Sequence, residues 1–121
     1  MTVSLRNDRV AVEILPLGAT LHSFSVRQPD GSWRNIVLSR PDITAFESSY
    51  LGATVGRLAN RVGGARLRIA GTEYQLKPNE GANQLHGGPG GFAEQVWEIA
   101  SSSDSQAVLR LTSPDGAQGY P

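Results

Sequence analysis

Apolar and polar residues alternate in short runs along most of the chain, and clusters of turn-forming residues separate these runs. Alternation with a period of two is typical of a strand that buries one face. The runs cover residues 3–5, 10–14, 21–26, 33–38, 67–69, 74–76, 97–99 and 109–111. No segment of about ten residues shows a helical period. The pattern therefore predicts an all-β protein of antiparallel strands with no substantial helix.

Turn-forming residues predict how some of these strands connect. The sequence Pro29-Asp-Gly31 is a strong turn signal and predicts a hairpin in which Trp33 pairs with Val26. A different local structure is expected at residues 42–47, where Asp42 can act as the N-cap of a single helical turn. That turn is too short to change the prediction of an all-β fold.

A long loop is expected between residues 77 and 92, which include five glycines and two prolines. Loops longer than about 12–15 residues are usually functional or disordered. His86 lies in this loop among glycines, which allow a backbone to approach a ligand closely. Its imidazole is placed to hydrogen-bond a small molecule, or the loop simply turns sharply and contains a histidine; the residues alone leave both interpretations open. The other histidine, His22, lies on the apolar face of a predicted strand and is expected to be a partly buried, hydrogen-bonded residue.

A second polar group lies between small residues in the segment 52–64, which contains Arg57, Asn60 and Arg61. Arginine offers five donors in a rigid fork, and asparagine offers both a donor and an acceptor. This combination suits adjacent sugar hydroxyls, carboxylates or phosphates. The alternative is a bulged strand with surface arginines. The glycine patterns of nucleotide-binding loops are absent from the segment.

Composition narrows the function classes. The chain of 121 residues has the length of one small domain. Its 11 basic residues balance 11 acidic ones, which argues against binding to nucleic acid or to an anionic membrane. It contains no cysteine, and its two histidines lack metal-ligand spacing, so no metal site is expected. It has no apolar run of membrane-spanning length and no signal sequence, so we expect a cytoplasmic protein.

Several segments in a fixed order resemble the aldose 1-epimerase (galactose mutarotase) family. They are residues 50–62, 71–76 and 83–88, Gly91-Phe92, Trp97, residues 113–116 and 119–121, and Gly18-Ala-Thr20. The resemblance covers essentially the whole chain and implies a large antiparallel β-sandwich, the galactose mutarotase-like supersandwich. It also implies interconversion of the α and β anomers of free hexoses such as glucose and galactose, by general acid–base ring opening without a cofactor. By the same resemblance, Asn60, Arg61 and His86 bind the sugar.

The resemblance also places the family's catalytic histidine and glutamate beyond Pro121. We therefore assign no catalytic residue to this chain. We expect residues 1–121 to be the N-terminal part of a single sandwich domain, truncated and inactive on its own. Strand edges and apolar faces that lack their partners would favour self-association.

Two alternatives stay open at this point. One is a relative that acts on hexose phosphates, in which arginines would bind the phosphate. The other is a non-catalytic carbohydrate-binding fragment that kept only the sugar contacts. The arginines available to the first alternative are Arg57, Arg61, Arg66 and Arg68.

Overall fold

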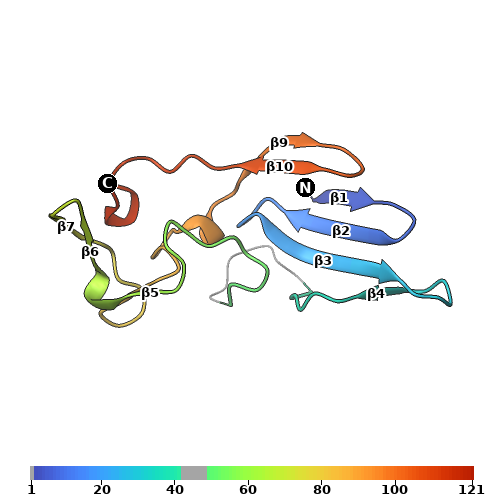
Figure 1. The fold of residues 1–121 in the computed structure, drawn as a ribbon, viewed down its shortest axis with the longest axis horizontal. Coiled ribbons are helices and arrows are strands. Elements are labelled where there is room, and N and C mark those ends of the chain that lie inside the picture. Colours follow the sequence, from blue (N-terminus) through green and yellow to red (C-terminus); the bar gives the residue numbers. More distant parts are fainter. Residues whose placement is uncertain (1, 42–48) are drawn as a thin grey trace.

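The computed structural model describes residues 2–41 and 49–121, and its strands form one four-stranded sheet and several two-stranded pairs (Figure 1). The large sheet contains β1 (Val3–Arg6), β2 (Val10–Leu15), β3 (Thr20–Arg27) and β4 (Trp33–Asn35). These strands lie side by side in chain order, and each neighbouring pair is antiparallel. The alternation predicted antiparallel strands in these four regions, and the structure has a strand in each.

Side-chain caps explain where the first strands reverse. Between β1 and β2, the Asn7 amide oxygen accepts hydrogen bonds from the N–H groups of Arg9 and Val10, both at 2.8 Å. Between β3 and β4, the Asp30 carboxylate accepts hydrogen bonds from the hydroxyl and the N–H of Ser32, at 2.6 and 2.9 Å. These two bonds hold the pKa of Asp30 below its usual value.

β4 is shorter than the alternation predicted. A strand was expected over residues 33–38, but the pairing ends at Asn35. The Asn35 amide oxygen accepts hydrogen bonds from the N–H of Phe24 at 3.1 Å and from the N–H of Val37 at 3.0 Å. Because this side chain competes with the backbone for ladder hydrogen bonds, the regular strand stops here.

The register of the same hairpin also differs from the prediction by one residue. Trp33 lies opposite Arg27 and not opposite Val26. The Gln28 N–H donates to the Ser32 carbonyl at 2.8 Å, which closes the loop directly before Trp33. Loop length sets hairpin register, so the position of this bond fixes which residues pair.

The rest of the chain forms short antiparallel pairs. They are β5 (Arg61–Val62) with β8 (Gln84–Leu85), β6 (Arg66–Ile69) with β7 (Thr72–Gln75), and β9 (Glu98–Ser102) with β10 (Ala107–Arg110). The helical elements of the described residues are three-residue 3-10 turns, η1 (Gly63–Ala65), η2 (Phe92–Glu94) and η3 (Ala117–Gly119). The prediction of no substantial helix is confirmed for the described residues. The helical turn expected at residues 42–47, with Asp42 as its cap, lies outside them.

The last hairpin is displaced from its predicted limits. Trp97 and Leu111 were expected in its strands, but Trp97 lies just before β9 and Leu111 just after β10. The Trp97 N–H donates to the Pro16 carbonyl at 2.9 Å, and its indole N–H donates to the Phe92 carbonyl at 3.0 Å. Trp97 therefore ties this hairpin to the first sheet and to η2 instead of extending β9.

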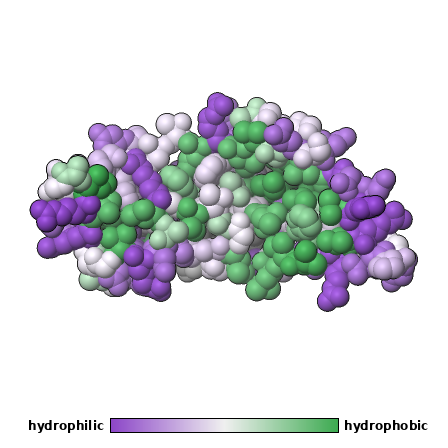
Figure 2. All heavy atoms as spheres, in the orientation of Figure 1, coloured by the Kyte–Doolittle hydropathy of each residue, from purple (hydrophilic) through white to green (hydrophobic). Residues whose placement is uncertain are grey.

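The tightly buried core is small. Ala65, Leu76 and Tyr120 form one buried cluster, with exposed fractions of 0, 2 and 4%. In contrast, Leu38 and Val96 are 77 and 72% exposed. Apolar side chains lie open over the four-stranded sheet on the face that Figure 2 shows. This apolar surface is available for contact with another protein surface.

Candidate functional site

The three residues expected to bind a sugar meet at one end of the β5–β8 pair. Arg61 lies opposite Leu85 in this antiparallel pair, so Asn60 and His86 are the next opposed positions. The His86 N–H donates to the Asn60 carbonyl at 2.9 Å. In return, the Asn60 N–H donates to Nδ1 of the His86 ring at 3.0 Å. The structure therefore brings Asn60, Arg61 and His86 together.

The bond to Nδ1 fixes the form of the His86 ring. A nitrogen that accepts a hydrogen bond carries no proton, so the proton of the neutral imidazole is on Nε2. The Nε2–H group is then a donor directed away from Asn60. A backbone N–H orients the ring here, and Asn60, which carries this N–H, directly precedes β5.

The Arg61 guanidinium is held by two neighbours. Its Nε donates to one Glu80 carboxylate oxygen at 2.5 Å, and its Nη2 donates to the other at 2.7 Å. Its Nη1 donates to the Asn60 side-chain oxygen at 3.1 Å. An arginine has five N–H donors. One N–H on Nη1 and one on Nη2 therefore stay available to a ligand within the described part of the chain.

The ion pair changes the acid–base properties of both partners. The hydrogen bonds from Arg61 hold the pKa of Glu80 below its usual value, and the same bonds raise the pKa of Arg61. The side chains are 54 and 37% exposed, so solvent screens the pair and its contribution to stability is modest. Its role is to fix the direction of the guanidinium.

Tyr50 adds an aromatic side to the cluster, and the sequence interpretation did not single it out. Its ring centroid lies 4.6 Å from that of His86, with the planes tilted by 59°. Tyr50, Asn60 and His86 all have positive φ angles, of 50, 59 and 50°. Such conformations are costly for residues other than glycine, and they occur often at functional sites. Burial raises the pKa of the Tyr50 phenol, and the charge of Glu94 raises it further.

Asn79 is a second residue that sequence reasoning missed. Its side-chain oxygen accepts a hydrogen bond from the Leu85 N–H at 2.6 Å, and its Nδ2 donates to the Leu85 carbonyl at 3.0 Å. The same Nδ2 group lies 3.4 Å from the Tyr50 hydroxyl. Asn79 therefore holds the strand that carries His86. The glycines and prolines of residues 77–92 predicted a loop there, but no spacing rule pointed to this contact.

Glycine is required where the His86 loop crosses the segment before Asn60. A Cβ placed on Gly87 would lie 1.6 Å from the Gly56 carbonyl oxygen, and Gly87 has a φ of +92°. No other residue type fits such an approach without moving one of the two backbones. This contact explains why glycines surround the histidine.

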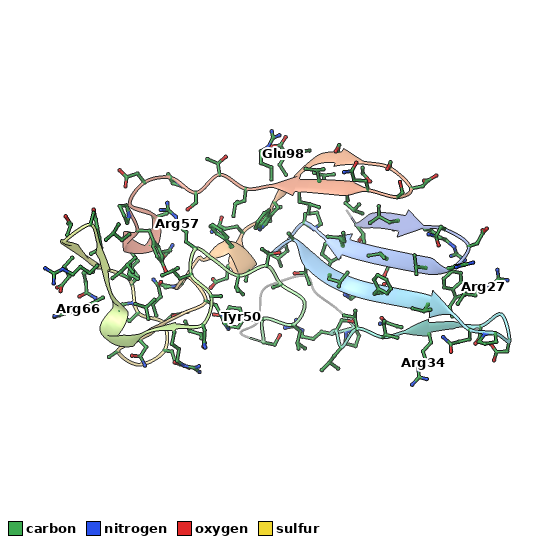
Figure 3. The ribbon with its side chains drawn as sticks, in the orientation of Figure 1. Arg27, Arg34, Tyr50, Arg57, Arg66 and Glu98 are labelled. Atoms are coloured by element: carbon green, nitrogen blue, oxygen red, sulfur yellow. The ribbon has the colours of Figure 1, made fainter. Side chains whose placement is uncertain are left out.

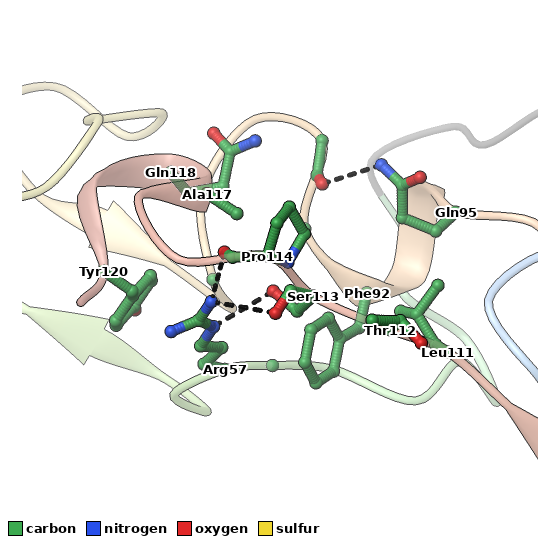
Figure 4. A pocket seen from close by; sticks show the side chains of 14 residues that line it. Arg57, Phe92, Gln95, Leu111, Thr112, Ser113, Pro114, Ala117, Gln118 and Tyr120 are labelled. Atoms are coloured by element: carbon green, nitrogen blue, oxygen red, sulfur yellow. Dashed lines mark hydrogen bonds between the residues drawn. The ribbon is translucent and has the colours of Figure 1, made fainter.

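Arg57 does not belong to the cluster. Its Nη1 donates to the Pro121 carbonyl at 2.6 Å. Its Nη2 donates to the Pro114 carbonyl at 2.6 Å, and its Nε donates to the Ser113 hydroxyl at 3.0 Å (Figure 4). The guanidinium also lies 5.5 Å from the centre of the Tyr120 ring. Arg57 therefore holds the segment 113–121 in place by binding its backbone.

A cavity of about 240 Å³ lies beside this Arg57 contact and is lined by Phe92, Leu111 and Gln118 among others. Asn60, Arg61 and His86 are not among its lining residues. Gly87, the neighbour of His86, does line it, so the polar cluster lies next to this cavity and not inside it.

The remaining arginines of the hexose-phosphate alternative do not join Arg61. Arg66 lies 3.8 Å from Glu73 across the β6–β7 hairpin, and it points outward at the end of the molecule opposite the large sheet (Figure 3). Arg68 donates to the Gly71 carbonyl at 3.3 Å in the turn of the same hairpin.

Across residues 2–41 and 49–121, side chains that could hold a metal ion do not cluster. Within the same ranges, no helix is long and apolar enough to cross a membrane.

His22 differs from the prediction in one respect. It is partly buried, as expected, but its Nδ1 is buried without a hydrogen-bond partner among the described residues. The β2–β3 register shifts between Glu13 and Ile14, and His22 is the residue of β3 left without an opposite partner.

Comparison with known proteins identifies relatives of the whole chain. Residues 1–121 match the family described as Aldose 1-epimerase. The chain is 39% identical over 122 residues to aldose 1-epimerase from Escherichia coli (strain K12), which covers 98% of this chain and 35% of the relative. It is 36% identical over 119 residues to galactose mutarotase from Mus musculus, covering 97% of this chain and 34% of the relative. The chain thus spans about a third of the length of these curated relatives.

Solved structures give the same result for the fold. The GalM/aldose epimerase homologue from C. elegans superposes with a TM-score of 0.89 at 28% identity, covering 98% of this chain and 38% of that one. Galactose 1-epimerase from Lactobacillus acidophilus NCFM superposes with a TM-score of 0.80 at 38% identity, covering 98% and 36%. The all-β architecture expected from the sequence is therefore shared with these structures.

Proposed function

The chain belongs to the aldose 1-epimerase family, and from this premise we propose that it forms the sugar-binding part of an enzyme that interconverts the α and β anomers of a free hexose such as glucose or galactose. The observation that carries the proposal is the mutual fixing of Asn60, Arg61 and His86. Each side chain has an internal hydrogen bond that orients it, and the three together keep donors available to a ligand.

We propose that these donors bind hydroxyl groups of one sugar ring. His86 donates through Nε2–H, because its Nδ1 is occupied by Asn60. Arg61 donates through the remaining N–H groups, one on Nη1 and one on Nη2, to neighbouring hydroxyl oxygens. Donors that are fixed before the ligand arrives lose little entropy on binding and hold the sugar in one orientation.

In the proposed reaction, a base removes the proton from the C1 hydroxyl while an acid protonates the ring oxygen. The bond between C1 and the ring oxygen breaks, the C1–C2 bond rotates, and closure on the other face gives the other anomer. Glu80 is poorly suited to be either group, because Arg61 binds both of its oxygens and holds its pKa low. We propose that a histidine and a glutamate outside residues 1–121 supply the acid and the base, so that residues 1–121 alone bind sugar without catalysing the reaction.

Polarimetry and ligand-observed NMR together test this proposal. We expect saturation transfer from residues 1–121 to galactose or glucose, and loss of transfer in His86→Ala and Arg61→Ala. Arg68→Ala is the matched control, because its side chain hydrogen-bonds the Gly71 carbonyl in the β6–β7 turn and none of the three proposed sugar-binding residues. We expect no acceleration of the optical relaxation of fresh α-galactose by residues 1–121. Acceleration that His86→Ala abolishes would place the acid and base within these residues. Absence of saturation transfer from folded protein would contradict the sugar site.

A further inference from the structure

We propose that Glu80 determines the substrate class of this site, by neutralising Arg61 so that the site selects an uncharged sugar over a phosphorylated one. The inference rests on the proposed function, because it concerns the ligand of the same three residues. It assigns a role to a carboxylate that the sugar-binding and acid–base steps leave unused.

The geometry of the ion pair supports this role. Guanidinium groups bind phosphate best through two parallel N–H donors on one edge of the fork. In this structure the Nε and Nη2 edge of Arg61 already binds both oxygens of Glu80, at 2.5 and 2.7 Å. A phosphate would have to displace this carboxylate or lie beside it. The donors that remain, one on each Nη, suit two neutral hydroxyl oxygens.

The surrounding charges point the same way. Within the described residues, Arg57 is bound to carbonyls of the segment 113–121, and Arg66 is paired with Glu73. Neither of these cations offsets Glu80 at the site.

The charge balance at the site follows from this ion pair. Glu80 binds Arg61 through both of its oxygens, so the two charges offset each other, and a phosphate group gains little net attraction from this arginine.

The size of the discrimination follows from Coulomb's law in water. A phosphate with a charge of about −2 held about 5 Å from the Glu80 carboxylate is weakened about tenfold at low salt, and less as salt screens the charges. Removing the Glu80 charge should therefore tighten the binding of a sugar phosphate about tenfold relative to the neutral sugar. Removal of a carboxylate that only supports the fold would leave the ratio of the two affinities unchanged.

The test compares galactose with galactose 6-phosphate on residues 1–121 and on Glu80→Gln, by NMR titration at low and high salt. We expect the ratio of the two dissociation constants to shift about tenfold toward the phosphate in Glu80→Gln, and the shift to shrink in high salt. Glu73→Gln removes a carboxylate that pairs with an arginine elsewhere, and it should leave the ratio unchanged. A shift below about twofold in Glu80→Gln would overturn the proposal.

Glu80→Asp separates charge from geometry. It keeps the negative charge but is too short to reach both Arg61 donors, so galactose should bind more weakly while the ratio stays near that of the parent. An equal shift in Glu80→Asp and Glu80→Gln would mean that geometry sets the selectivity, against the proposal. A titration with inorganic phosphate distinguishes failure of the proposed function from failure of the role given to Glu80. If no variant binds galactose, the proposed function fails, and tighter phosphate binding by Glu80→Gln alone would still support the neutralisation of Arg61.

Discussion

The hydrogen bond between Tyr120 and Gln84 is expected to be the most sensitive polar contact in the core. The Gln84 side chain is fully buried, and its Nε2 donates to the Lys77 carbonyl at 3.0 Å and lies 3.4 Å from the Gln118 carbonyl. Its Oε1 accepts a hydrogen bond from the Tyr120 hydroxyl. The contact therefore joins β8, which precedes His86, to the end of the described chain.

Tyr120→Phe removes the donor and keeps the ring, including its contact with the Arg57 guanidinium. The Gln84 Oε1 is then buried without a partner. Leaving a buried polar group unsatisfied costs about 1–3 kcal/mol. We expect Tyr120→Phe to lower the free energy of unfolding by about 2 kcal/mol, a large fraction of the total for a small domain.

Urea unfolding followed by circular dichroism measures this loss, and amide hydrogen exchange at Leu85 shows whether β8 opens more often. Tyr74→Phe is the matched control, because the Tyr74 hydroxyl makes no hydrogen bond within the described part of the chain. It should change stability by less than about 0.5 kcal/mol. Equal effects of the two substitutions, or a loss below about 0.5 kcal/mol in Tyr120→Phe, would refute the reasoning.

Three further predictions follow from the same structure. Gly87→Ala should destabilise the fold by more than about 2 kcal/mol in urea unfolding, because a Cβ would clash with the Gly56 carbonyl at a positive φ; a neutral result would show that the loop moves freely. Because Arg61 lowers the folded-state pKa of Glu80, the ion pair stabilises the protein above the unfolded-state pKa of about 4.3, and this contribution disappears as pH falls through the lower folded value. Urea unfolding should therefore show a larger stability difference between the parent and Glu80→Gln at neutral pH than at pH 3. A difference independent of pH would contradict a stabilising role of the ion pair. Exposed Leu38 and Val96 should promote self-association that Leu38→Lys or Val96→Lys weakens in sedimentation velocity; a concentration-independent monomer would contradict this.

The sequence predicted the strands of the large sheet well, because each combines period-two alternation with strong turn chemistry. β2, for example, alternates over six residues, and Asn7 before it caps the turn with its own side chain. Alternation cannot show where a side chain competes with the ladder. That is why the early end of β4 at Asn35 was not predicted.

The sequence singled out three residues of the candidate site, and it did not predict their contacts or the other residues around them. Asn60, Arg61 and His86 stood out through glycine-rich surroundings and a family resemblance, and they do meet. Glu80 was not predicted, because a carboxylate in a loop has no pattern that marks its partner 19 positions away. Periodicity could not predict the strand β8 either, because two residues are too few to show an alternation.

An NMR titration of residues 1–121 with galactose tests the central claim most directly, with the backbone amides and the His86 and Arg61 side chains observed. We predict saturable shifts at Asn60, Arg61 and His86, with the His86 Nε2–H proton slowed in exchange as it donates to the sugar. The amides of Leu111 and Gln118, which line the cavity beside Arg57, should not shift. Shifts confined to that cavity, or no saturable shift from folded protein, would contradict the assignment of these three residues to a sugar site.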